Sequence, residues 1–471
     1  MSVVSPDEIV RSDAATIASA VQSGRLDAID VVEAFQAVIS ARNGELNALV
    51  RYSPQSARAQ AHTVATRVRA GEQLPLAGVP LIVKDNVFVA GTAISQGSRL
   101  FANHVAPRDA IAVERARAAG AVIIGIGNCP EFACKGQTNS PLHGIARNPH
   151  DLLLTPGGSS GGNAAGIAAN FAPIGLGTDG GGSGRRPPAH TGTVGFKPSF
   201  GAIPYGPGFP EPFWGIATIA PMGRTVADVM ALFEAVAGID PRDPDSIPIE
   251  LRQTDADMGK LRIAYSPRLG LDVPVDDDVA TAIDTAVEHL RCAGWRISSA
   301  APRWPTDLKE DTLMPLQAGG LAALYGNAFR TDASRFDPDI AAQIERGLGF
   351  SAADVGTALE GSATIKHAVG QFFCDYDLLL CPTAPCVAWS ADRLGPTHIG
   401  GQAVGARGHA VFTPFFNHAL TPAISIPGGT GRTGLPVGLQ IIGRRGADWR
   451  VLLAAEAAES ILASHSTPTK A

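Results

Sequence analysis

The chain has 471 residues, of which 45% are hydrophobic and 17% charged, and its formal net charge is −6. This apolar content is enough for a large core and excludes a disordered chain, while the interspersed acids and bases argue against a nucleic-acid binder. No apolar run reaches the roughly 18 to 20 residues needed to span a bilayer, and residues 1–8 lack the basic and apolar regions of a signal peptide. We therefore expect a soluble, cytoplasmic protein with no membrane or nucleic-acid partner.

Helical patterns fill the first part of the chain, residues 1–70. Apolar residues recur there at three- and four-residue spacing, which indicates amphipathic helices, and polar residues and glycines supply caps and stops. The predicted helices run from a cap at Ser12 or Asp13 to Gly24, from 28 to 42 with Asn43-Gly44 as the stop, and over 56–70.

Short apolar strands alternate with helices from residue 76 onward. The predicted strands lie at 81–83, 121–124, 172–176, 377–380, 423–426 and 438–442. Helices are predicted at 109–119, at 162–170 and after a cap at Thr225. Strands that are apolar on both faces indicate a single large mixed β-sheet covered by helices on both faces. The fold class is therefore α/β, and because strands recur at both ends of the chain we expect one domain over 1–471.

The cysteines and histidines form no recognisable disulfide or metal pattern. The six cysteines lack C-x-x-C spacing, and none of the eleven histidines is paired at the i, i+4 spacing of a helical metal site. We therefore expect free, buried thiols, no metal and no cofactor.

Two glycine-rich loops, each containing a serine, are the strongest indication of chemistry. The first, residues 157–162, holds Ser159 and Ser160, and the second, residues 177–183, ends at Ser183. Glycine loses more chain entropy on folding than other residues do. Its density here therefore indicates that bare backbone N–H groups approach something, such as a reacting carbonyl.

A lysine, Lys84, ends the apolar run 80–83. Desolvation at the end of a buried strand lowers the pKa of an ammonium group, and a neutral lysine is a usable general base. The alternative is an ordinary lysine that reaches solvent or pairs with Asp85.

Two other motifs overlap the loops but lack the expected context. Ser159 and Ser160 both fit G-x-S-x-G, the nucleophile elbow of a Ser-His-Asp hydrolase, yet Thr155-Pro156 interrupts the approach and no histidine is singled out. Residues 175–180 fit the dinucleotide fingerprint G-x-G-x-x-G. Pro187-Pro188 is expected to obstruct the helix that should follow, and no acidic residue lies about 20 positions further on.

The order of these motifs resembles the amidase signature family. The resemblance covers most of the chain outside about 205–370. The matching segments, besides the two serine loops, are Gly78-Val79-Pro80-Leu81-Ile82-Val83-Lys84-Asp85, Gly120-Ala121-Val122-Ile123-Ile124-Gly125, Asn128-Cys129-Pro130-Glu131-Phe132-Ala133, Gly195-Phe196-Lys197-Pro198, Pro382-Thr383-Ala384-Pro385 and Gly434-Leu435-Pro436-Val437-Gly438-Leu439-Gln440.

The resemblance implies a serine amidohydrolase that converts a carboxylic amide into an acid plus ammonia or an amine through an acyl-enzyme. Ser183 matches the nucleophile, Ser159 the serine that follows a cis peptide bond, and Lys84 the base that acts through Ser159. The turn that ends at the nucleophile matches the oxyanion hole, and its neighbours match supporting positions. The oxyanion positions are Gly180, Gly181 and Gly182, and the supporting positions are Ser160, Asp179 and Arg185. The family implies no cofactor and is compatible with a homodimer.

The chain departs from the family pattern at Gly180, Gly184 and Pro188, where the family often has a side chain, an apolar residue and an alanine. Arg186 is an additional arginine beside Arg185. It would suit an acidic or carbonyl-rich substrate, although a solvent-facing or salt-bridged side chain is the interpretation we favour. The glutamine usual here in glutamyl-tRNA amidotransferase subunits is absent, which counts against that activity.

The resemblance places a catalytic signature core at 76–204 and a divergent region at 205–370, which we expect to supply the substrate pocket. An aromatic, proline-rich stretch opens this region and favours an aryl or otherwise apolar acyl group. Core packing is the alternative use of these aromatic residues. The expected pocket residues are Arg186, Tyr205, Phe209, Phe213 and Trp214.

Three other functions remain open. They are an amidotransferase-type subunit that needs a partner, a Ser-His-Asp hydrolase that uses Ser159 or Ser160, and a non-catalytic binding protein. Amide turnover by the chain alone would exclude both the partner-dependent subunit and the binding protein. Activity that is lost on replacing a histidine, and not on replacing Lys84, would favour the Ser-His-Asp hydrolase.

Overall fold

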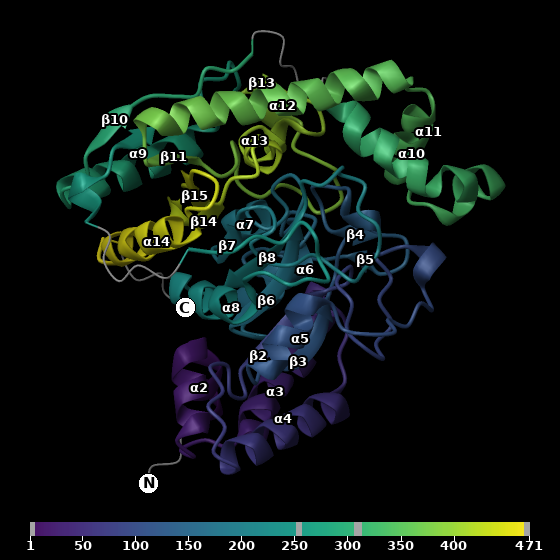
Figure 1. Ribbon diagram of the computed structural model, residues 1–471, viewed down its shortest axis with the longest axis vertical. Helices are drawn as coiled ribbons and strands as arrows, with labels where there is room; N and C mark the ends of the chain where they lie inside the picture. Colours follow the sequence, from purple (N-terminus) through teal and green to yellow (C-terminus); the bar gives the residue numbers. More distant parts are fainter. Residues whose placement is uncertain (1–4, 251–256, 306–312, 466–471) are drawn as a thin grey trace.

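One mixed β-sheet of eleven strands runs through the centre of the molecule (Figure 1). The computed structural model describes residues 5–250, 257–305 and 313–465. In order across the sheet, the strands are β1 (Leu49–Arg51), β3 (Val122–Gly127), β2 (Pro80–Lys84), β6 (Ile174–Asp179), β8 (Thr218–Gly223), β7 (Val194–Lys197), β14 (Ala423–Thr430), β15 (Pro436–Gly443), β11 (Leu378–Pro382), β9 (Ile263–Tyr265) and β10 (Ile297–Ser299). Two small hairpins are formed by β4 (Asn139–Ser140) with β5 (Gly144–Ile145) and by β12 (His398–Ile399) with β13 (Gln402–Ala403).

The sheet has two parallel groups joined by antiparallel strands. β3, β2 and β6 are parallel on one side, and β11, β9 and β10 are parallel on the other. The strands between them, β8, β7, β14 and β15, pair antiparallel. β2, β3 and β6 are buried along their whole length, as parallel strands covered on both faces must be. The predicted mixed sheet and the α/β class are therefore confirmed.

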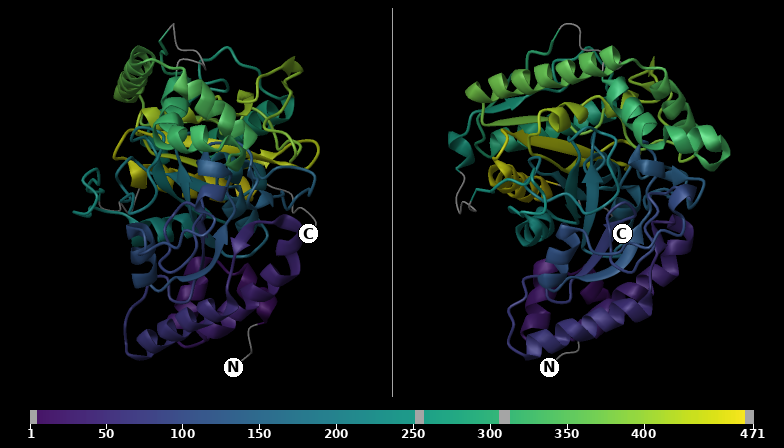
Figure 2. Two further views of the ribbon diagram at one scale, coloured as in Figure 1. Left: turned by 90° about the vertical axis from the view of Figure 1, so that its right-hand side faces the viewer. Right: turned by 45° about the vertical axis from the view of Figure 1, so that its right-hand side comes forward.

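Helices cover both faces of this sheet, as the turned views in Figure 2 show. α5, α8, α14 and α9 follow one another along one face, and α6 and α7 pack on the other. α10, α11 and α12 lie together at the end of the molecule opposite the N-terminal helices (Figure 1). The helices are α1 (Pro6–Arg11), α2 (Ala14–Gln22), α3 (Ala28–Leu46), α4 (Pro54–Arg69), α5 (Ile111–Ala118), α6 (Gly161–Ala168), α7 (Arg186–Thr191), α8 (Val226–Val236), α9 (Asp277–Cys292), α10 (Met314–Thr331), α11 (Pro338–Leu348), α12 (Ala352–Asp375), α13 (Pro414–His418) and α14 (Asp448–Ala463). Short 3₁₀ helices lie at Arg99–Phe101, Glu131–Ala133, Met258–Lys260, Ala333–Arg335 and Gly408–Ala410.

The predicted N-terminal helices are present, and one is longer than expected. Asp13, not Ser12, caps α2. The predicted stop at Asn43-Gly44 is wrong, because α3 continues to Leu46 and ends at Asn47, whose φ is 48°. Leu46 is fully buried, and this burial outweighs the roughly 1 kcal/mol that a glycine costs inside a helix.

Two short helices, α1 and α7, lie where the sequence predicted none. Pro187-Pro188 does not obstruct a helix, because both prolines occupy the first turn of α7. The first N–H groups of a helix have no intrahelical partner, so a proline there loses nothing. α1 uses the same arrangement, with Pro6 directly after the N-cap Ser5, which forms a capping box with Glu8.

All six cysteines are free, as expected, but they are not all buried. Cys129, Cys134, Cys381 and Cys386 lie in the interior. Cys292 and Cys374 are exposed on α9 and α12, so the prediction of buried thiols is wrong for these two.

Within the described ranges, no helix combines the length and the apolar character needed to cross a membrane. Part of two predicted segments lies outside those ranges. These parts are residues 1–4 of the expected N-terminal helical segment, and residues 251–256 and 306–312 of the expected pocket region.

Candidate active site

β2 and β6 lie side by side in parallel and end at the same edge of the sheet. Val83 of β2 pairs with its neighbour Leu176 of β6, so Lys84 at the end of β2 comes close to Thr178 near the end of β6. The first serine loop immediately precedes α6 and contacts both strand ends. The carboxyl ends of parallel strands therefore bring the lysine and this loop together, as they do in other open α/β sheets.

Lys84 is fully buried and faces two hydroxyl groups. Its Nζ lies 2.8 Å from Ser159 Oγ and 2.9 Å from Thr178 Oγ1. Asn86 Nδ2 donates to the same threonine oxygen at 3.0 Å. Burial lowers the pKa of Lys84 to about 8, because the uncharged amine is favoured away from water. Above that pH, Lys84 is largely neutral and able to take a proton from Ser159.

The first glycine-rich loop packs against the protein's own backbone. A Cβ added to Gly158 would lie 2.8 Å from the backbone of Gln137, and one added to Gly162 would lie 2.2 Å from the backbone nitrogen of Asn128. The peptide bond between Gly158 and Ser159 is cis, as the resemblance implied. The glycines of this loop therefore hold Ser159 in place by close packing, whereas the sequence led us to expect an approach to a ligand.

Asp179 organises the turn that carries Ser183. Its carboxylate accepts hydrogen bonds from Gly182 N at 2.6 Å and from Gly184 N at 3.1 Å, and it pairs with Arg185 at 2.8 Å. Burial alone would raise the pKa of this carboxyl group, but the charge and hydrogen bonds of Arg185 hold it well below its ordinary value. Asp179 therefore stays ionised and keeps the turn in shape.

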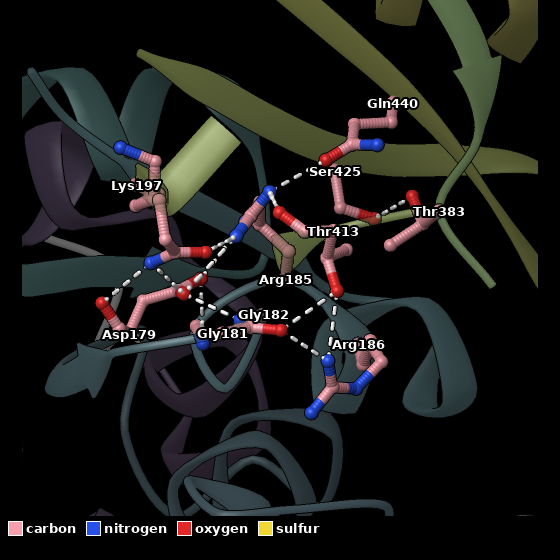
Figure 3. Close-up of polar contacts among 12 residues, drawn as sticks. Asp179, Gly181, Gly182, Arg185, Arg186, Lys197, Thr383, Thr413, Ser425 and Gln440 are labelled. Atoms are coloured by element: carbon pink, nitrogen blue, oxygen red, sulfur yellow. Dashed lines mark hydrogen bonds and ion pairs between the residues drawn. The ribbon is translucent and has the colours of Figure 1, made fainter. Parts of the chain in front are cut away.

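Arg185 connects this turn to the C-terminal part of the chain (Figure 3). Its guanidinium is fully buried and donates to Gln440 Oε1 at 2.7 Å, to Asn417 Oδ1 at 2.6 Å and to the Thr413 carbonyl at 3.1 Å. Asn417 closes the network by donating to Asp179 Oδ1 at 2.9 Å. These contacts hold the turn against β15 and α13, and the supporting role that the resemblance gave to Arg185 stays a prediction.

The backbone N–H groups of the turn are not equivalent. Gly182 has a φ of 118°, which favours glycine, and its N–H is already used by Asp179. A Cβ on Gly181 would meet no atom within 4 Å, so this residue borders open space. Of the expected oxyanion donors, Gly180 and Gly181 remain as candidates, with the N–H of Ser183 beside them.

Ser160 has a supporting contact. Its Oγ donates to the carbonyl oxygen of Thr178 at 3.1 Å. In the part of the chain that the structure describes, no histidine forms a hydrogen bond with Ser159 or Ser160. The Ser-His-Asp alternative on the first loop therefore has no geometric support.

Arg186 is not solvent-facing and forms no salt bridge with any residue that the structure describes, which corrects the role that we favoured from the sequence. Its side chain is buried, and its NH1 group donates to the Gly181 carbonyl and, at 2.7 Å, to Thr413 Oγ1. The Thr413 hydroxyl donates in turn to the same Gly181 carbonyl at 2.8 Å. Figure 3 shows the two arginines turned toward different partners, Arg185 toward Asp179 and Arg186 toward Thr413.

Three cavities meet around Gly180, Gly181 and Phe213. The Ser159 cavity has a volume of about 20 Å³ and is also lined by Thr178. The Ser183 cavity has a volume of about 250 Å³ and is lined by the expected nucleophile together with Arg186, Arg407 and His409. The apolar cavity has a volume of about 230 Å³ and is lined mainly by Ile216, Leu271, Val273, Leu313, Met314, Leu316, Val411, Pro414 and Phe415.

The expected aromatic pocket residues are only partly brought together. Phe213 lines all three cavities, and Tyr205 and Phe209 line the Ser159 cavity. Phe213 also occupies the space that a side chain at position 180 would need, since a Cβ on Gly180 would lie 2.8 Å from its ring. Trp214 lines none of the three cavities; it is 47% exposed, and its indole N–H donates to the Leu316 carbonyl.

Three polar residues of the site were missed by the sequence analysis. The sequence could have indicated Thr178, because its hydroxyl lies between an apolar strand and a glycine turn. Asn86 lies two residues after Lys84 but belongs to no motif. Thr413 is 232 positions from Gly181 along the chain, so only the folded sheet brings the two together. Among the described residues, no group of three or more His, Cys, Asp or Glu side chains is placed to hold a metal ion.

Known proteins with similar sequences and structures act on amides or belong to amidotransferases. The family profile described as Amidase matches residues 30–452. A glutamyl-tRNA(Gln) amidotransferase subunit from Deinococcus deserti is 36% identical over 465 residues, which cover 92% of this chain and 93% of that protein. An acylamidase of Rhodococcus erythropolis is 33% identical over 458 residues, which cover 95% of each chain.

Solved structures similar to this chain also include amidase-type enzymes. A bacterial aryl acylamidase of the amidase signature family superposes with a TM-score of 0.87 at 28% identity, covering 96% of each chain. A 6-aminohexanoate cyclic dimer hydrolase in complex with its substrate superposes with a TM-score of 0.85 at 27% identity, covering 96% of this chain and 97% of that one.

Proposed function

Because this chain belongs to the amidase signature family and is a hydrolase of amide C–N bonds, we propose that Ser183 is its nucleophile, Ser159 its proton relay and Lys84 its base. The observation that carries the proposal is the contact between a buried amine and a hydroxyl, 2.8 Å long, at the end of two parallel strands. A serine hydroxyl is a weak nucleophile until a base takes its proton. Burial supplies such a base, because it lowers the pKa of Lys84 to about 8.

The reaction begins with attack of Ser183 Oγ on the carbonyl carbon of the amide. The proton of Ser183 passes to Ser159 Oγ while the proton of Ser159 passes to Lys84 Nζ, since a hydroxyl both donates and accepts. The tetrahedral intermediate then breaks its C–N bond, and the proton returns through Ser159 to the leaving nitrogen. Water attacks the acyl-enzyme by the same relay, which releases the acid and restores Ser183.

The negative charge of the tetrahedral intermediate needs fixed donors. The N–H groups of Gly180, Gly181 and Ser183 are the ones we assign, because Asp179 already uses that of Gly182. Each donor of this kind typically contributes about 3 to 4 kcal/mol to the transition state. Asp179, Arg185 and their hydrogen-bond partners then act by holding the turn that carries these groups.

We propose further that the apolar cavity takes an aryl or otherwise apolar part of the substrate. It borders Gly180 and Gly181, and apolar side chains dominate its walls. The named activities of the Rhodococcus acylamidase and of the bacterial aryl acylamidase support this preference. Small-molecule amides are the substrates of the family as a whole.

An amidotransferase-type subunit is the second candidate, because a relative with that name is 36% identical over nearly the whole chain. Such a subunit would need a partner protein for stable activity. Our proposal is an enzyme that acts without one, alone or as the homodimer that the family resemblance suggests. Sedimentation of the purified chain, alone and during turnover, measures that assembly state.

The test is turnover by the purified lone chain. Release of ammonia from primary amides and of aniline from anilides is measured, and a single turnover is stopped with acid to trap an acyl group for peptide mass spectrometry. We expect turnover without a partner and an acyl group on Ser183. The proposal fails if the acyl group is found on Ser159 or Ser160, or if every amide requires a second protein.

A further inference from the structure

Arg186 is a buried cation that the proposed mechanism does not use. Its side chain is only 6% exposed, and its NH1 group donates to the Gly181 carbonyl and to Thr413 Oγ1. Its Nε is buried without a hydrogen-bond partner, and no described carboxylate forms an ion pair with its guanidinium. A buried charge is ordinarily paired, because an unpaired charge away from water is strongly destabilising. Within the described ranges, Arg186 therefore lacks the anion that such a side chain normally has.

The described residues around Arg186 in the Ser183 cavity supply no free negative charge. Arg407 and His409 line the Ser183 cavity beside it. Burial, together with the charges of the two arginines, lowers the pKa of His409 far below its ordinary value, so this histidine stays neutral. Asp339, the carboxylate among the lining residues, lies 3.3 Å from Lys135 Nζ and is paired there. Among the described residues that line this cavity, no unpaired carboxylate is therefore left for Arg186.

The position of this cavity decides which part of an amide it receives. Ser159, which returns the proton to the leaving nitrogen, lines a different and smaller cavity of about 20 Å³. The acyl group has to extend away from that side. The Ser183 cavity, of about 250 Å³, offers space next to the nucleophile, and an acyl chain that enters it meets Arg186.

We propose that Arg186 binds a carboxylate on the acyl part of the substrate, so that the enzyme favours amides whose acyl group is acidic. The inference deepens the proposed function and rests on it. A carboxylate in the Ser183 cavity would accept a hydrogen bond from the guanidinium that lines it and neutralise the buried charge, and such charge-assisted bonds are among the strong ones in proteins. The apolar cavity remains available to the rest of the same substrate, because the two cavities share Gly181 and Phe213.

The test compares two amides that differ only in the end of the acyl chain. Succinamate ends in a carboxylate and butyramide in a methyl group, and the ratio of their kcat/KM values is measured. We expect the wild-type enzyme to favour succinamate by at least about tenfold, and Arg186→Gln to lower that ratio by about 10- to 100-fold. The ratio is used because this substitution also removes the contacts to Gly181 and Thr413, which affect both amides.

Thr413→Val is the matched control. It removes the hydroxyl that bonds the same Gly181 carbonyl and Arg186, but it leaves the charge in place. We expect it to lower both rates together and to leave the ratio unchanged. A wild-type preference for butyramide, or a ratio that Arg186→Gln does not alter, would overturn the inference.

A binding measurement separates this inference from the proposed function. Calorimetry compares succinate with butyrate on the wild type and on Arg186→Gln, and it requires no turnover. Succinate binding that depends on Arg186, in a protein that hydrolyses no amide, would support the acidic site and contradict the proposed function. Hydrolysis of neutral amides by an enzyme that binds succinate no better than butyrate would support the proposed function and contradict the acidic site.

Discussion

The two glycine-rich loops of the site look alike in sequence but use glycine for different reasons. In the first loop, a Cβ on Gly158, Gly161 or Gly162 would come within 3 Å of other protein atoms. In the second, a Cβ on Gly180 or Gly182 would meet side chains, Gly182 also adopts a backbone conformation that favours glycine, and Gly181 borders open space. The first loop is thus a packed support for Ser159, and the second presents backbone N–H groups to a cavity.

The two adjacent arginines differ in the same way. Arg185 is fully buried and its charge is matched by Asp179. Arg186 is also buried but has no anionic partner among the described residues. The difference teaches that burial identifies a structural residue only when its polar groups are satisfied. An unsatisfied buried charge next to a nucleophile is better explained by a ligand.

The largest expected effect is on kcat, and it differs between a serine of the second loop, Ser183, and a serine of the first, Ser160. Ser183→Ala removes the nucleophile, so we expect kcat to fall by about 10⁴-fold or more. Ser160→Ala removes one hydrogen bond to Thr178 and should cost far less. Steady-state kinetics on a reactive amide, with circular dichroism to verify folding, measures both. Equal losses in the two variants would contradict our distinction between the loops.

The second prediction concerns the paired arginine. Arg185→Met leaves Asp179 buried without its partner, and we expect the free energy of unfolding to fall by about 3 to 5 kcal/mol. Urea denaturation measures this change. Arg432→Met is the control, because its ion pair with Asp278 has an arginine side chain that is 83% exposed, and such a pair contributes about 0 to 1 kcal/mol. A small loss for Arg185→Met would mean that the turn does not depend on this charge pair.

The third prediction exchanges glycine for alanine in each loop. Gly162→Ala forces a Cβ to within 2.2 Å of a backbone nitrogen, so we expect a loss of about 1 to 3 kcal/mol or more in stability. Gly181→Ala meets no protein atom within 4 Å and should change stability by less than about 0.5 kcal/mol. Its new methyl group borders the space of the substrate carbonyl, so kcat/KM should fall instead. If Gly181→Ala lost stability and Gly162→Ala did not, the roles that we assign to the two loops would be wrong.

The smallest effect concerns the aromatic residues. Phe213 lines all three cavities, whereas Trp214 lines none of them. We expect Phe213→Ala to raise KM for an anilide by about tenfold, a change typical of a lost apolar contact in a pocket. Trp214→Ala should change KM much less. A larger effect of Trp214→Ala would restore the pocket role that the sequence first indicated for this residue.

The sequence predicted the sheet, and it suggested the residues that we propose as catalytic, because each depends on a local pattern. Apolar runs identified β2, β3 and β6, and a lysine at the end of one of them needed only the desolvation argument to become a candidate base. Ser159 and Ser183 followed from the glycines around them and from the family resemblance. The continuation of α3 to Leu46 depended instead on packing, which outweighed the local signal at Asn43-Gly44.

The parts that the sequence missed depend on contacts between distant segments. Arg186 contacts Thr413, which lies 227 positions away along the chain, and lines the Ser183 cavity together with the similarly distant Arg407 and His409. The close packing of Gly162 depends on Asn128 in the same way. Trp214 was expected in the pocket on composition alone, yet its indole bonds to the start of α10 instead.

The central claim is that a buried, neutral Lys84 activates Ser183 through Ser159. The most direct measurement is the rate of labelling by a fluorophosphonate from about pH 6 to about pH 10, with the labelled residue located by peptide mass spectrometry. We predict a label on Ser183 whose rate rises as the pH passes through about 8, because Lys84 loses its proton there, and we predict that Lys84→Ala labels slowly without this rise. A label on Ser159 or Ser160, or an identical pH dependence without Lys84, would contradict the account.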